Sequence, residues 1–317
     1  MAIAIPTSEE LLQAHNAIAP YIHNTAVVTS KTLNQMSGAS LFFKCENFQR
    51  MGAFKMRGAT SAILALSANE RERGVVTHSS GNFGQAVALA AKELGVPAYV
   101  VMPENAPEVK KAAVKGYGAT VTECESTIHA REAAAAAIQE ETGASPLHPS
   151  NCTNVIVGNA TAAMELLSEQ PNLDVLCAPV GGGGLLAGTA LAGRFFGKNC
   201  KTFGGEPQQV DDAYRSLQSG IIETNTSTNT IADGLRTHLG DQNFPIIQQH
   251  VEDIICVSEA QIISAMKLIW ERMKIIVEPS SAVALAAILK EKERFKNKQV
   301  GIIISGGNVT LSALPFS

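Results

Sequence analysis

The chain has 317 residues, of which 45% are hydrophobic and 17% charged, a composition typical of globular proteins with one large or two medium domains. Lys and Arg number 25 against 29 Asp and Glu, a formal net charge of −4, and 5% of the residues are aromatic. This balance argues against a nucleic-acid or membrane-surface partner, because the sequence has neither a basic stripe nor many aromatic side chains for stacking bases.

No apolar run reaches the roughly 20 residues that a membrane span needs, and the N-terminal segment turns acidic at Glu9, unlike a secretory leader. We therefore expect a cytoplasmic protein without a membrane partner. The six cysteines are scattered, with neither a C-x-x-C pair nor the spacing of zinc ligands. This pattern favours buried free thiols in a reducing compartment.

Short segments rich in Val, Ile and Phe alternate with Ala-rich segments of helical period. The alternation predicts βαβ units and an α/β fold with mainly parallel sheets flanked by helices. Ser258 and Gln261 have the spacing of a capping box, and residues 219–230 are polar and predict a surface excursion. In chain order, the pattern predicts strands at residues 40–47, 74–78, 97–102, 119–124, 175–180, 201–205, 254–257 and 300–304, and helices at 54–65, 82–94, 107–115 and 128–141, with further helices after the glycines at 181–184 and after Ser258.

The block from residue 74 to residue 150 has the clearest alternation of strands and helices and the size of a small α/β domain. We predict that this block forms a small, mobile substrate domain. Residues 1–73 and 151–317 would together form the large, cofactor-binding domain.

Four consecutive glycines, Gly181 to Gly184, lie between a predicted strand and a predicted helix. Consecutive glycines let backbone N–H groups converge on an anion, and a helix N-terminus adds partial positive charge, so this loop is a candidate phosphate site. Gly182, Gly184 and Ala187 also match the dinucleotide pattern G-x-G-x-x-A, with Glu206 at the spacing of a ribose-binding carboxylate. On this stretch alone, an NAD-dependent enzyme fits as well, and so does a turn needed only for close strand–helix packing.

Three further stretches have the composition of functional sites. Lys55 lies at a predicted loop-to-helix junction beside Phe54, where a desolvated amine becomes nucleophilic, although most lysines lie on solvated faces. Residues 77–85 (THSSGNFGQ) end a strand and begin a helix, so they would bind a carboxylate or simply cap the helix. Residues 304–309 (ISGGNV) end a buried strand at the edge where α/β sheets bind ligands, or form only a tight turn.

Taken in order, the motifs at residues 46–59, 79–85, 181–188 and 305–308 resemble those of the fold type II pyridoxal-phosphate enzymes, the tryptophan synthase β family. Within it, the resemblance is closest to the serine racemases and short serine/threonine dehydratases, a group that includes 3-hydroxyaspartate dehydratases. The resemblance favours pyridoxal phosphate over a dinucleotide as the ligand of the glycine loop, since a dinucleotide enzyme would not need the Lys55 and Ser305 motifs. Further matches lie at residues 230–234, 270–274 and 277–280.

The resemblance implies a role for each matching residue. Lys55 would bind the cofactor covalently, give it up to the substrate amine and take the Cα proton, with Phe54 beside the ring. Asn82 would bond the ring hydroxyl and Ser305 the pyridine nitrogen, and a neutral serine there suits elimination and racemisation better than transamination. The cofactor phosphate would lie on Gly181, Gly182, Gly183 and Gly184, and the substrate carboxylate on Ser79, Ser80, Gly81 and Asn82.

Ser80 matches the serine that, in serine racemases, reprotonates Cα from the face opposite the lysine. Threonine dehydratases commonly carry alanine at this position. The resemblance therefore implies that Lys55 and Ser80 are the two catalytic residues of a racemase, and a helix cap is the alternative interpretation of Ser80.

The resemblance also implies a divalent cation, Mg²⁺ or in its place Ca²⁺ or Mn²⁺, at Glu206, Val210 and Asp212. Two carboxylates and one backbone carbonyl are the hard oxygen ligands that such ions prefer. A solvated acidic turn is the alternative.

Arg131 and His238 are the residues expected to determine substrate choice. Arg131 matches an active-site arginine of serine racemases, whereas Ser150 stands where they have asparagine and His238 where they have serine. Two cationic groups near the β-substituent would suit a second carboxylate, which favours 3-hydroxyaspartate alongside serine. A surface loop histidine is the alternative for His238.

We therefore expect a pyridoxal-phosphate-dependent ammonia-lyase that converts L-serine or 3-hydroxyaspartate into an α-keto acid and ammonia, with racemisation at Cα. The resemblance also implies a homodimer. A threonine-preferring dehydratase would share every cofactor residue, and an NAD-dependent Rossmann enzyme is the remaining alternative.

Overall fold

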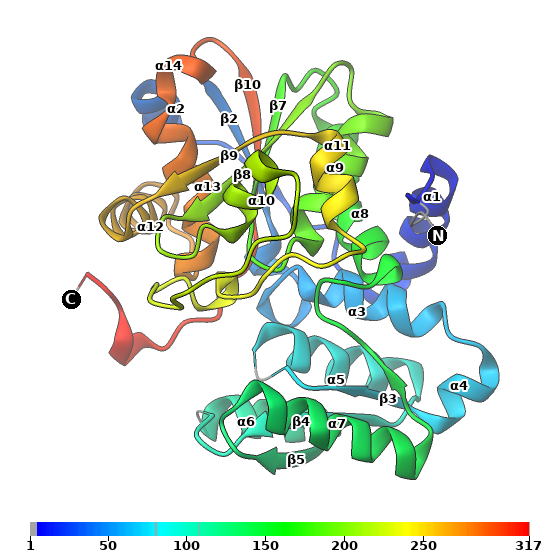
Figure 1. The fold of residues 1–317 in the computed structure, drawn as a ribbon. Helices are drawn as coiled ribbons and strands as arrows, with labels where there is room; N and C mark the ends of the chain where they lie inside the picture. Colours follow the sequence, from blue (N-terminus) through cyan, green and yellow to red (C-terminus); the bar gives the residue numbers. More distant parts are fainter. Residues whose placement is uncertain (1–4, 80, 107, 317) are drawn as a thin grey trace.

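The computed structural model of the chain describes residues 5–79, 81–106 and 108–316. These residues form two separate, mainly parallel sheets, one of six strands and one of four, each flanked by helices (Figure 1). The predicted α/β class is therefore confirmed.

The six-stranded sheet brings the two ends of the sequence together. Its order is β1-β2-β10-β7-β8-β9, and every neighbouring pair is parallel except β1 with β2. Because parallel strands end at one edge of a sheet, the loops that follow β2, β10, β7 and β8 emerge along the same edge. The strands are β1 (Val27–Val28), β2 (Ser40–Cys45), β7 (Val175–Pro179), β8 (Lys201–Pro207), β9 (Val251–Val257) and β10 (Gln299–Ile304).

Helices cover both faces of this sheet, which explains why β7 and β10 are almost continuously apolar rather than alternating. Two separate hydrophobic clusters, one on each face, form its core. One face is covered by α2 (Lys31–Ser37), α12 (Glu259–Met273), α13 (Pro279–Lys290) and α14 (Lys292–Phe295), and the other by α1 (Ser8–Ile18), α8 (Thr153–Glu169), α9 (Gly184–Phe196) and α11 (Phe244–His250) (Figure 1).

The four-stranded sheet takes all its strands from one continuous stretch of the chain. Its order is β5-β4-β3-β6, with every pair parallel. The connections from β3 to β4 and from β4 to β5 cross the sheet in one direction, and the connection from β5 to β6 crosses it in the other. Because such connections are right-handed, the helices of the first two lie on one face of the sheet and the helix of the third lies on the opposite face. The elements are β3 (Val75–Thr77), α5 (Asn82–Leu94), β4 (Ala98–Pro103), α6 (Glu108–Gly116), β5 (Thr120–Cys124), α7 (Ile128–Thr142) and β6 (Ser145–Pro146).

Helix α3 (Lys55–Leu64) packs against both parts of the molecule. Met56, Ala59 and Ile63 belong to the same hydrophobic cluster as the residues of the four-stranded sheet, and α3 also contacts α8. Short helix α4 (Ala68–Arg73) then leads into β3. Whether the chain divides into moving domains at residues 73 and 150 remains a prediction.

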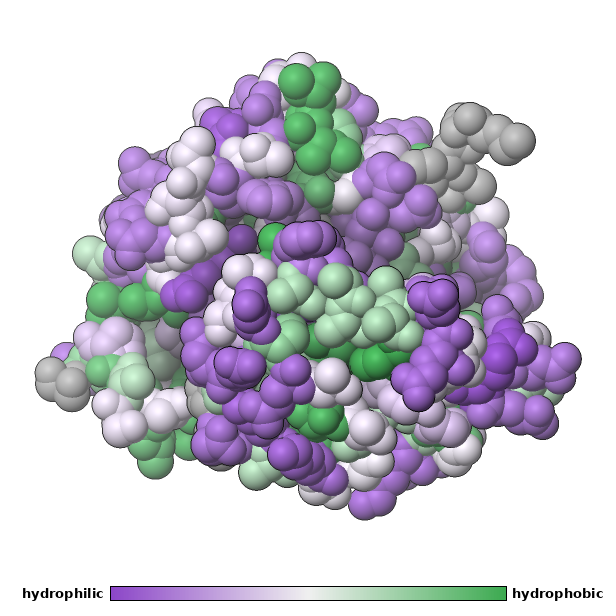
Figure 2. Space-filling view, turned by 60° about the horizontal axis from the view of Figure 1, so that its bottom comes forward, coloured by the Kyte–Doolittle hydropathy of each residue, from purple (hydrophilic) through white to green (hydrophobic). Residues whose placement is uncertain are grey.

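Helix α7 contributes no buried residue, although it contacts β3, β4 and β5. It carries five consecutive alanines, Ala133 to Ala137. Figure 2, which brings this end of the molecule forward, shows a band of moderate hydropathy bordered by hydrophilic residues. The small side chains of Ala135 and Ala136 line the cavity described below.

Every predicted strand and helix is present with bounds within three residues of the prediction. The predicted capping box is confirmed, since the Ser258 and Gln261 side chains bond each other's backbone N–H groups at 3.3 and 2.9 Å. Helix α8 was missed because it is buried on all sides, so its apolar residues form no periodic stripe.

The six cysteines are free thiols. Cys45 and Cys177 are buried as predicted, whereas the other four are partly exposed. Within the described parts of the chain, no helix is both long and apolar enough to cross a bilayer.

Candidate active site

Lys55 is the first residue of α3, and its side chain points into a closely packed region. Its Nζ donates a hydrogen bond of 2.6 Å to the carbonyl oxygen of Pro149 and lies 4.9 Å from the ring centre of Phe54 and 5.6 Å from that of Phe83. Burial lowers the pKa of Lys55 to about 8, against the opposing effect of the nearby Glu278 carboxylate. An amine with this pKa is partly neutral near pH 7.5, as a nucleophile or a proton acceptor must be.

Ser305 directly follows β10 and is bonded to the loop before Lys55. The backbone N–H of Phe54 donates to the Ser305 carbonyl at 2.9 Å, and Ala53 pairs with Gly306 in an antiparallel bridge. The motifs around Lys55 and Ser305, 250 positions apart in the sequence, therefore lie side by side, as the resemblance implied.

The hydroxyl of Ser305 has one side-chain neighbour, the hydroxyl of Ser281 at 2.9 Å. Ser281 donates to the carbonyl of Gly306 at 2.6 Å and accepts from the Gly306 N–H at 2.7 Å. Because the Ser281 proton is used on Gly306, the Ser305 hydroxyl is the donor in the bond between the two hydroxyls, and it would have to turn from Ser281 to donate to another acceptor. A buried, neutral donor is the group that the pyridine nitrogen was predicted to meet.

Asn82, the first residue of α5, has both ends of its amide occupied. Its Nδ2 donates to the two Glu278 carboxylate oxygens at 3.2 and 3.0 Å, and its Oδ1 accepts from Asn308 Nδ2 at 2.9 Å. Asn308 also donates to the carbonyl of Met51 at 2.9 Å. Asn82 is thus held in one orientation by side chains from two distant segments of the chain, and Met51 in turn fixes Asn308.

Sequence analysis did not single out Glu278, although the matching stretch at 277–280 contains it. Glu278 is 5% exposed and is the N-cap residue of α13. Its backbone N–H donates to the Gly306 carbonyl. Burial raises the pKa of Glu278 to about 7, against the opposing effect of the Asn82 hydrogen bonds. A glutamate directly before a proline at a helix start was the available signal, but only the fold shows that this carboxylate is buried beside Lys55 and Asn82.

The glycine loop, Gly181 to Gly184, follows β7 and forms the N-terminus of α9. Gly183 has φ +81°, which L side chains rarely adopt, and a methyl group placed on it would approach Asn243 Oδ1 and Leu239 Cδ2 to 2.6 Å. A methyl group on Gly182 would collide with Ser150 Oγ. The loop is therefore a backbone cradle at a helix N-terminus, a suitable place for a phosphate.

The segment around Ser79 and Gly81 precedes α5. Gly81 is the N-cap residue, makes no side-chain cap bond, and has no atom within 4 Å of the place where a side chain would begin. Since Asn82 uses its amide on Glu278 and Asn308, it does not cap the helix either. The first N–H groups of a helix suit a carboxylate. Ser80 lies outside the described residues, so its predicted role stays a prediction.

Arg131 and His238 each bond a nearby backbone group. Arg131 is half-buried on α7 and donates to the carbonyl of Thr127, one turn away on its own helix, at 3.4 Å. His238 is exposed, and its Nδ1 accepts from the backbone N–H of Asn225 at 3.3 Å. No hydrogen bond or ion pair joins the two among the described residues.

A cavity of about 610 Å³ lies between α7 and the segment that follows β6. His148 lines it, and its Nδ1 accepts the backbone N–H groups of Ser150 and Asn151 at 3.2 and 2.8 Å, so that Nε2 is left as the donor. Its ring packs edge-on against His78 at 6.4 Å. Burial, with His78 and Lys55 nearby, lowers the pKa of His148 to about 4. Sequence analysis missed this neutral histidine, because nothing local distinguishes it from a surface histidine.

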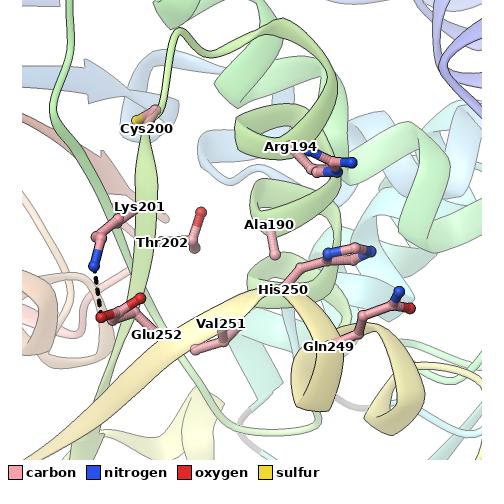
Figure 3. A pocket seen from close by; sticks show the side chains of 9 residues that line it. All are labelled: Ala190, Arg194, Cys200, Lys201, Thr202, Gln249, His250, Val251 and Glu252. Atoms are coloured by element: carbon pink, nitrogen blue, oxygen red, sulfur yellow. Dashed lines mark hydrogen bonds and ion pairs between the residues drawn. The ribbon is translucent and has the colours of Figure 1, made fainter.

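A second cavity, of about 430 Å³, lies at the opposite edge of the six-stranded sheet, where β8 and β9 begin (Figure 3). Arg194 and His250 line it together with the Lys201–Glu252 ion pair. Figure 3 shows that these side chains come from the ends of α9 and α11 and the first residues of the two strands. It contains none of the predicted site residues.

Glu206 and Asp212 form a buried acidic pair at the end of β8. Both are 0% exposed. Glu206 accepts the backbone N–H groups of Ala213 and Tyr214 at 3.0 and 2.8 Å, at the start of α10 (Asp212–Ser219), while Asp212 accepts from the Leu239 N–H and from Asn225. Burial, with the Asp212 carboxylate nearby, raises the pKa of Glu206 well above its usual value.

This pair is compatible with a hard cation. Neither carboxylate has an ion-pair partner within the described part of the chain, and buried carboxylates are costly without one. No group of three or more His, Cys, Asp or Glu side chains suitable for a metal exists among the described residues. Any ion here would therefore also need carbonyl oxygens, such as that of the buried Val210, and water.

The comparisons with known proteins agree with this geometry. The model of the family described as pyridoxal-phosphate-dependent enzymes matches residues 18–306. Serine racemase from Dictyostelium discoideum is 51% identical over 316 residues, covering 98% of both chains. A β-hydroxyaspartate dehydratase from Paracoccus denitrificans is 47% identical and covers 99% of both.

The fold is also similar to solved structures. The crystal structure of the Dictyostelium discoideum serine racemase superimposes with a TM-score of 0.94, covering 97% of this chain and 100% of the other. The similarity extends over both sheets, so the predicted motifs and the architecture that carries them are found together.

Proposed function

Because the chain belongs to the pyridoxal-phosphate-dependent enzymes, we propose that it dehydrates a small β-hydroxy amino acid, L-serine or 3-hydroxyaspartate, to an α-keto acid and ammonia, and racemises at Cα. The observation that carries this proposal is the partly neutral amine of Lys55, which lies beside the Phe54 ring in a loop that is bonded to Ser305 through the Phe54 backbone N–H. The similarity to a serine racemase and a β-hydroxyaspartate dehydratase supports the substrate class.

Pyridoxal phosphate, when bound, supplies the electron sink that makes the Cα proton of an amino acid removable. Lys55 would hold it covalently, with the phosphate on the glycine loop at 181–184. Asn82 would face its ring hydroxyl and Ser305 its pyridine nitrogen. The fixed orientation of Asn82 and the buried, neutral hydroxyl of Ser305 both support this arrangement.

Lys55 Nζ is then the group that takes the proton from Cα and returns one. This amine donates a hydrogen bond of 2.6 Å to the carbonyl of Pro149, and the bond fixes the position of the amine. The N-terminus of α5, with Ser79 and Gly81, would bind the substrate carboxylate through the N–H groups of its first turn. Binding at this point orients Cα toward Lys55, which is worth several orders of magnitude in rate for well-aligned groups.

Racemisation needs a second proton donor on the other side of Cα, and we propose Ser80 for this role. It precedes the helix start that binds the carboxylate. For a substrate with a second carboxylate, Arg131 is the cation we propose, since its guanidinium has no carboxylate partner among the described residues. His238 contributes less, because it is exposed and bonded to Asn225.

We also propose that Glu206, Asp212 and the carbonyl of Val210 hold Mg²⁺, with Ca²⁺ or Mn²⁺ as substitutes. Two buried carboxylates that form no ion pair with any described side chain support this. Residues 74–150 would close over the substrate, and a homodimer is proposed on the resemblance alone. The cytoplasmic location expected from the sequence stays a prediction.

Chiral chromatography of the products tests the function. The purified holoenzyme with Mg²⁺ is given L-serine, L-threonine and each 3-hydroxyaspartate isomer, beside Lys55→Ala and, as a control, exposed Lys31→Ala. Pyruvate with D-serine, or oxaloacetate from a hydroxyaspartate isomer, is the expected result, and Lys55→Ala should form neither. If threonine is the preferred substrate and no D-amino acid forms, the threonine-preferring dehydratase replaces the proposal, and full activity of Lys55→Ala would exclude both.

A further inference from the structure

The glycine loop is covered by one continuous segment of the chain, residues 235–243, which no motif singled out. Methyl groups placed on Gly181, Gly182 and Gly183 would meet, in turn, Leu235 Cα at 2.6 Å, Thr237 Oγ1 at 2.9 Å and Leu239 Cδ2 at 2.6 Å. We call residues 235–243 the covering segment. Because the covering segment lies directly against these three glycines, a shift of the segment would shift the backbone of the glycine loop.

Asn243, at the end of the covering segment, is fully buried and bonds the loop directly. Its Nδ2 donates to the carbonyl of Gly182 at 2.8 Å and to that of Ser150 at 3.1 Å. Its Oδ1 accepts the N–H of Gly240 at 3.1 Å, within the covering segment itself. One amide therefore ties the glycine loop, the Ser150 segment and the covering segment together.

The other end of the connection is the acidic pair. Asp212 Oδ2 accepts the backbone N–H of Leu239 at 3.3 Å, and Asn225 bonds the other Asp212 oxygen. Asn225 in turn donates its N–H to His238. Asp212 thus holds the covering segment at Leu239, the residue whose side chain packs on Gly183.

An unbroken series of contacts therefore runs from the acidic pair to the carbonyl of Gly182. Asp212 holds Leu239, the next residue Gly240 bonds Asn243, and Asn243 bonds Gly182. A cation on Asp212 would fix the direction of this carboxylate, and an oriented carboxylate would fix the segment that shapes the loop. We propose that Asn243 is a positioning residue for the cofactor phosphate and that, through the covering segment, it couples cation binding at Glu206 and Asp212 to cofactor binding at Gly181–Gly184.

Coupling of this kind is reciprocal. If Mg²⁺ raises the affinity for pyridoxal phosphate by some factor, pyridoxal phosphate must raise the affinity for Mg²⁺ by the same factor. The inference rests on the metal site and the cofactor roles proposed above. It differs from them in predicting how the two sites depend on each other and which side chain transmits the dependence.

The test measures the dissociation constant of pyridoxal phosphate from the full chain, by the visible absorbance of the bound cofactor, in MgCl₂ and in EDTA. A second titration measures Mg²⁺ binding by calorimetry with and without the cofactor. For the unmodified protein we expect a roughly tenfold tighter cofactor constant in MgCl₂ and an equal gain in Mg²⁺ affinity when the cofactor is bound. Asn243→Ala should bind the cofactor at least tenfold more weakly and show the same constant in both buffers.

Gln248→Ala is the matched control, because it removes an amide from an exposed position of α11, the helix that Asn243 precedes. It should behave like the unmodified protein. Circular dichroism shows whether Asn243→Ala is folded, and the measurements on the unmodified protein stand even if it is not. Equal cofactor constants in MgCl₂ and EDTA, or full coupling retained in a folded Asn243→Ala, would overturn the inference.

The outcomes separate this inference from the proposed function. Absence of any Mg²⁺ binding would remove both the metal site and the coupling, while dehydratase activity would be unaffected by that result. Intact coupling in a protein that makes no keto acid from any tested amino acid would support the inference and contradict the proposed reaction.

Discussion

Asn82 donates its side-chain amide to both carboxylate oxygens of Glu278, at 3.2 and 3.0 Å, across 196 positions of sequence. The bond joins the first residue of a helix beside the four-stranded sheet to the residue before a helix on the six-stranded sheet. It therefore fixes the group expected to face the cofactor ring and connects the two parts of the molecule at the site. The acceptor of this bond is the Glu278 carboxylate, and burial raises the pKa of Glu278 to about 7.

Glu278 should make the stability of the apo protein depend on pH. Because its folded pKa is about 7 and its usual value 4.5, the folded protein binds more protons than the unfolded chain between these values. Its contribution to stability is fully present below pH 4.5 and is lost as the pH rises through 7, on the order of 3 kcal/mol in all. Urea unfolding at pH 5 and pH 8 should show this loss for the unmodified protein and a smaller one for Glu278→Gln. Exposed Glu252→Gln is the control, and an unchanged pH dependence in Glu278→Gln would contradict the assignment.

Arg57, on α3, should be one of the most stabilising side chains of the protein. It is 0% exposed and bonds Glu46 and Glu165 through both oxygens of each, at 2.7 to 2.8 Å. Arg57→Met leaves two buried carboxylates without this partner, so we expect a loss of about 3–5 kcal/mol in the free energy of unfolding. Lys201→Met breaks an exposed pair with Glu252 and should cost less than about 1 kcal/mol. Chemical denaturation of both variants checks the difference, and similar losses would contradict it.

Gly183→Ala should weaken cofactor binding more than it weakens the fold. The added methyl group forces a left-handed residue, at about 1–2 kcal/mol, and also meets Asn243 and Leu239 at 2.6 Å. Gly95→Ala is a matched control, because Gly95 has φ +67° with no atom nearby. We expect at least a tenfold weaker cofactor dissociation constant for Gly183→Ala and an unchanged one for Gly95→Ala. Equal constants in both variants would show that the loop does not hold the phosphate.

Ser305→Ala should retain the cofactor but lower kcat about tenfold, the effect of one lost hydrogen bond to the reacting system. Ser281→Ala removes the neighbouring hydroxyl, which bonds the Gly306 backbone, and should lower stability with little change in kcat. Steady-state kinetics and the visible spectrum of both variants distinguish the roles. An unchanged kcat and spectrum in Ser305→Ala would mean that this hydroxyl does not face the cofactor.

The sequence by itself determined the class of fold, the bounds of most elements and the motifs at Lys55, Gly181–Gly184 and Ser305. Strand and helix periods, glycine runs and helix caps are local patterns, and the matching motifs are short enough to be identified without contacts. Even the capping box at Ser258 was visible, since both of its residues lie within one turn.

The tertiary structure alone decided which distant groups meet. Strand order places the end of β10 beside the loop before α3, and so brings Ser305 to Phe54 and Glu278 to Asn82. It also places His238 near Asp212, and the predicted roles of Arg131 and His238 in substrate choice stay predictions. Burial, which makes Glu278 and Asn243 significant, is a property of packing between segments far apart in the chain, so no local pattern of residues could predict it.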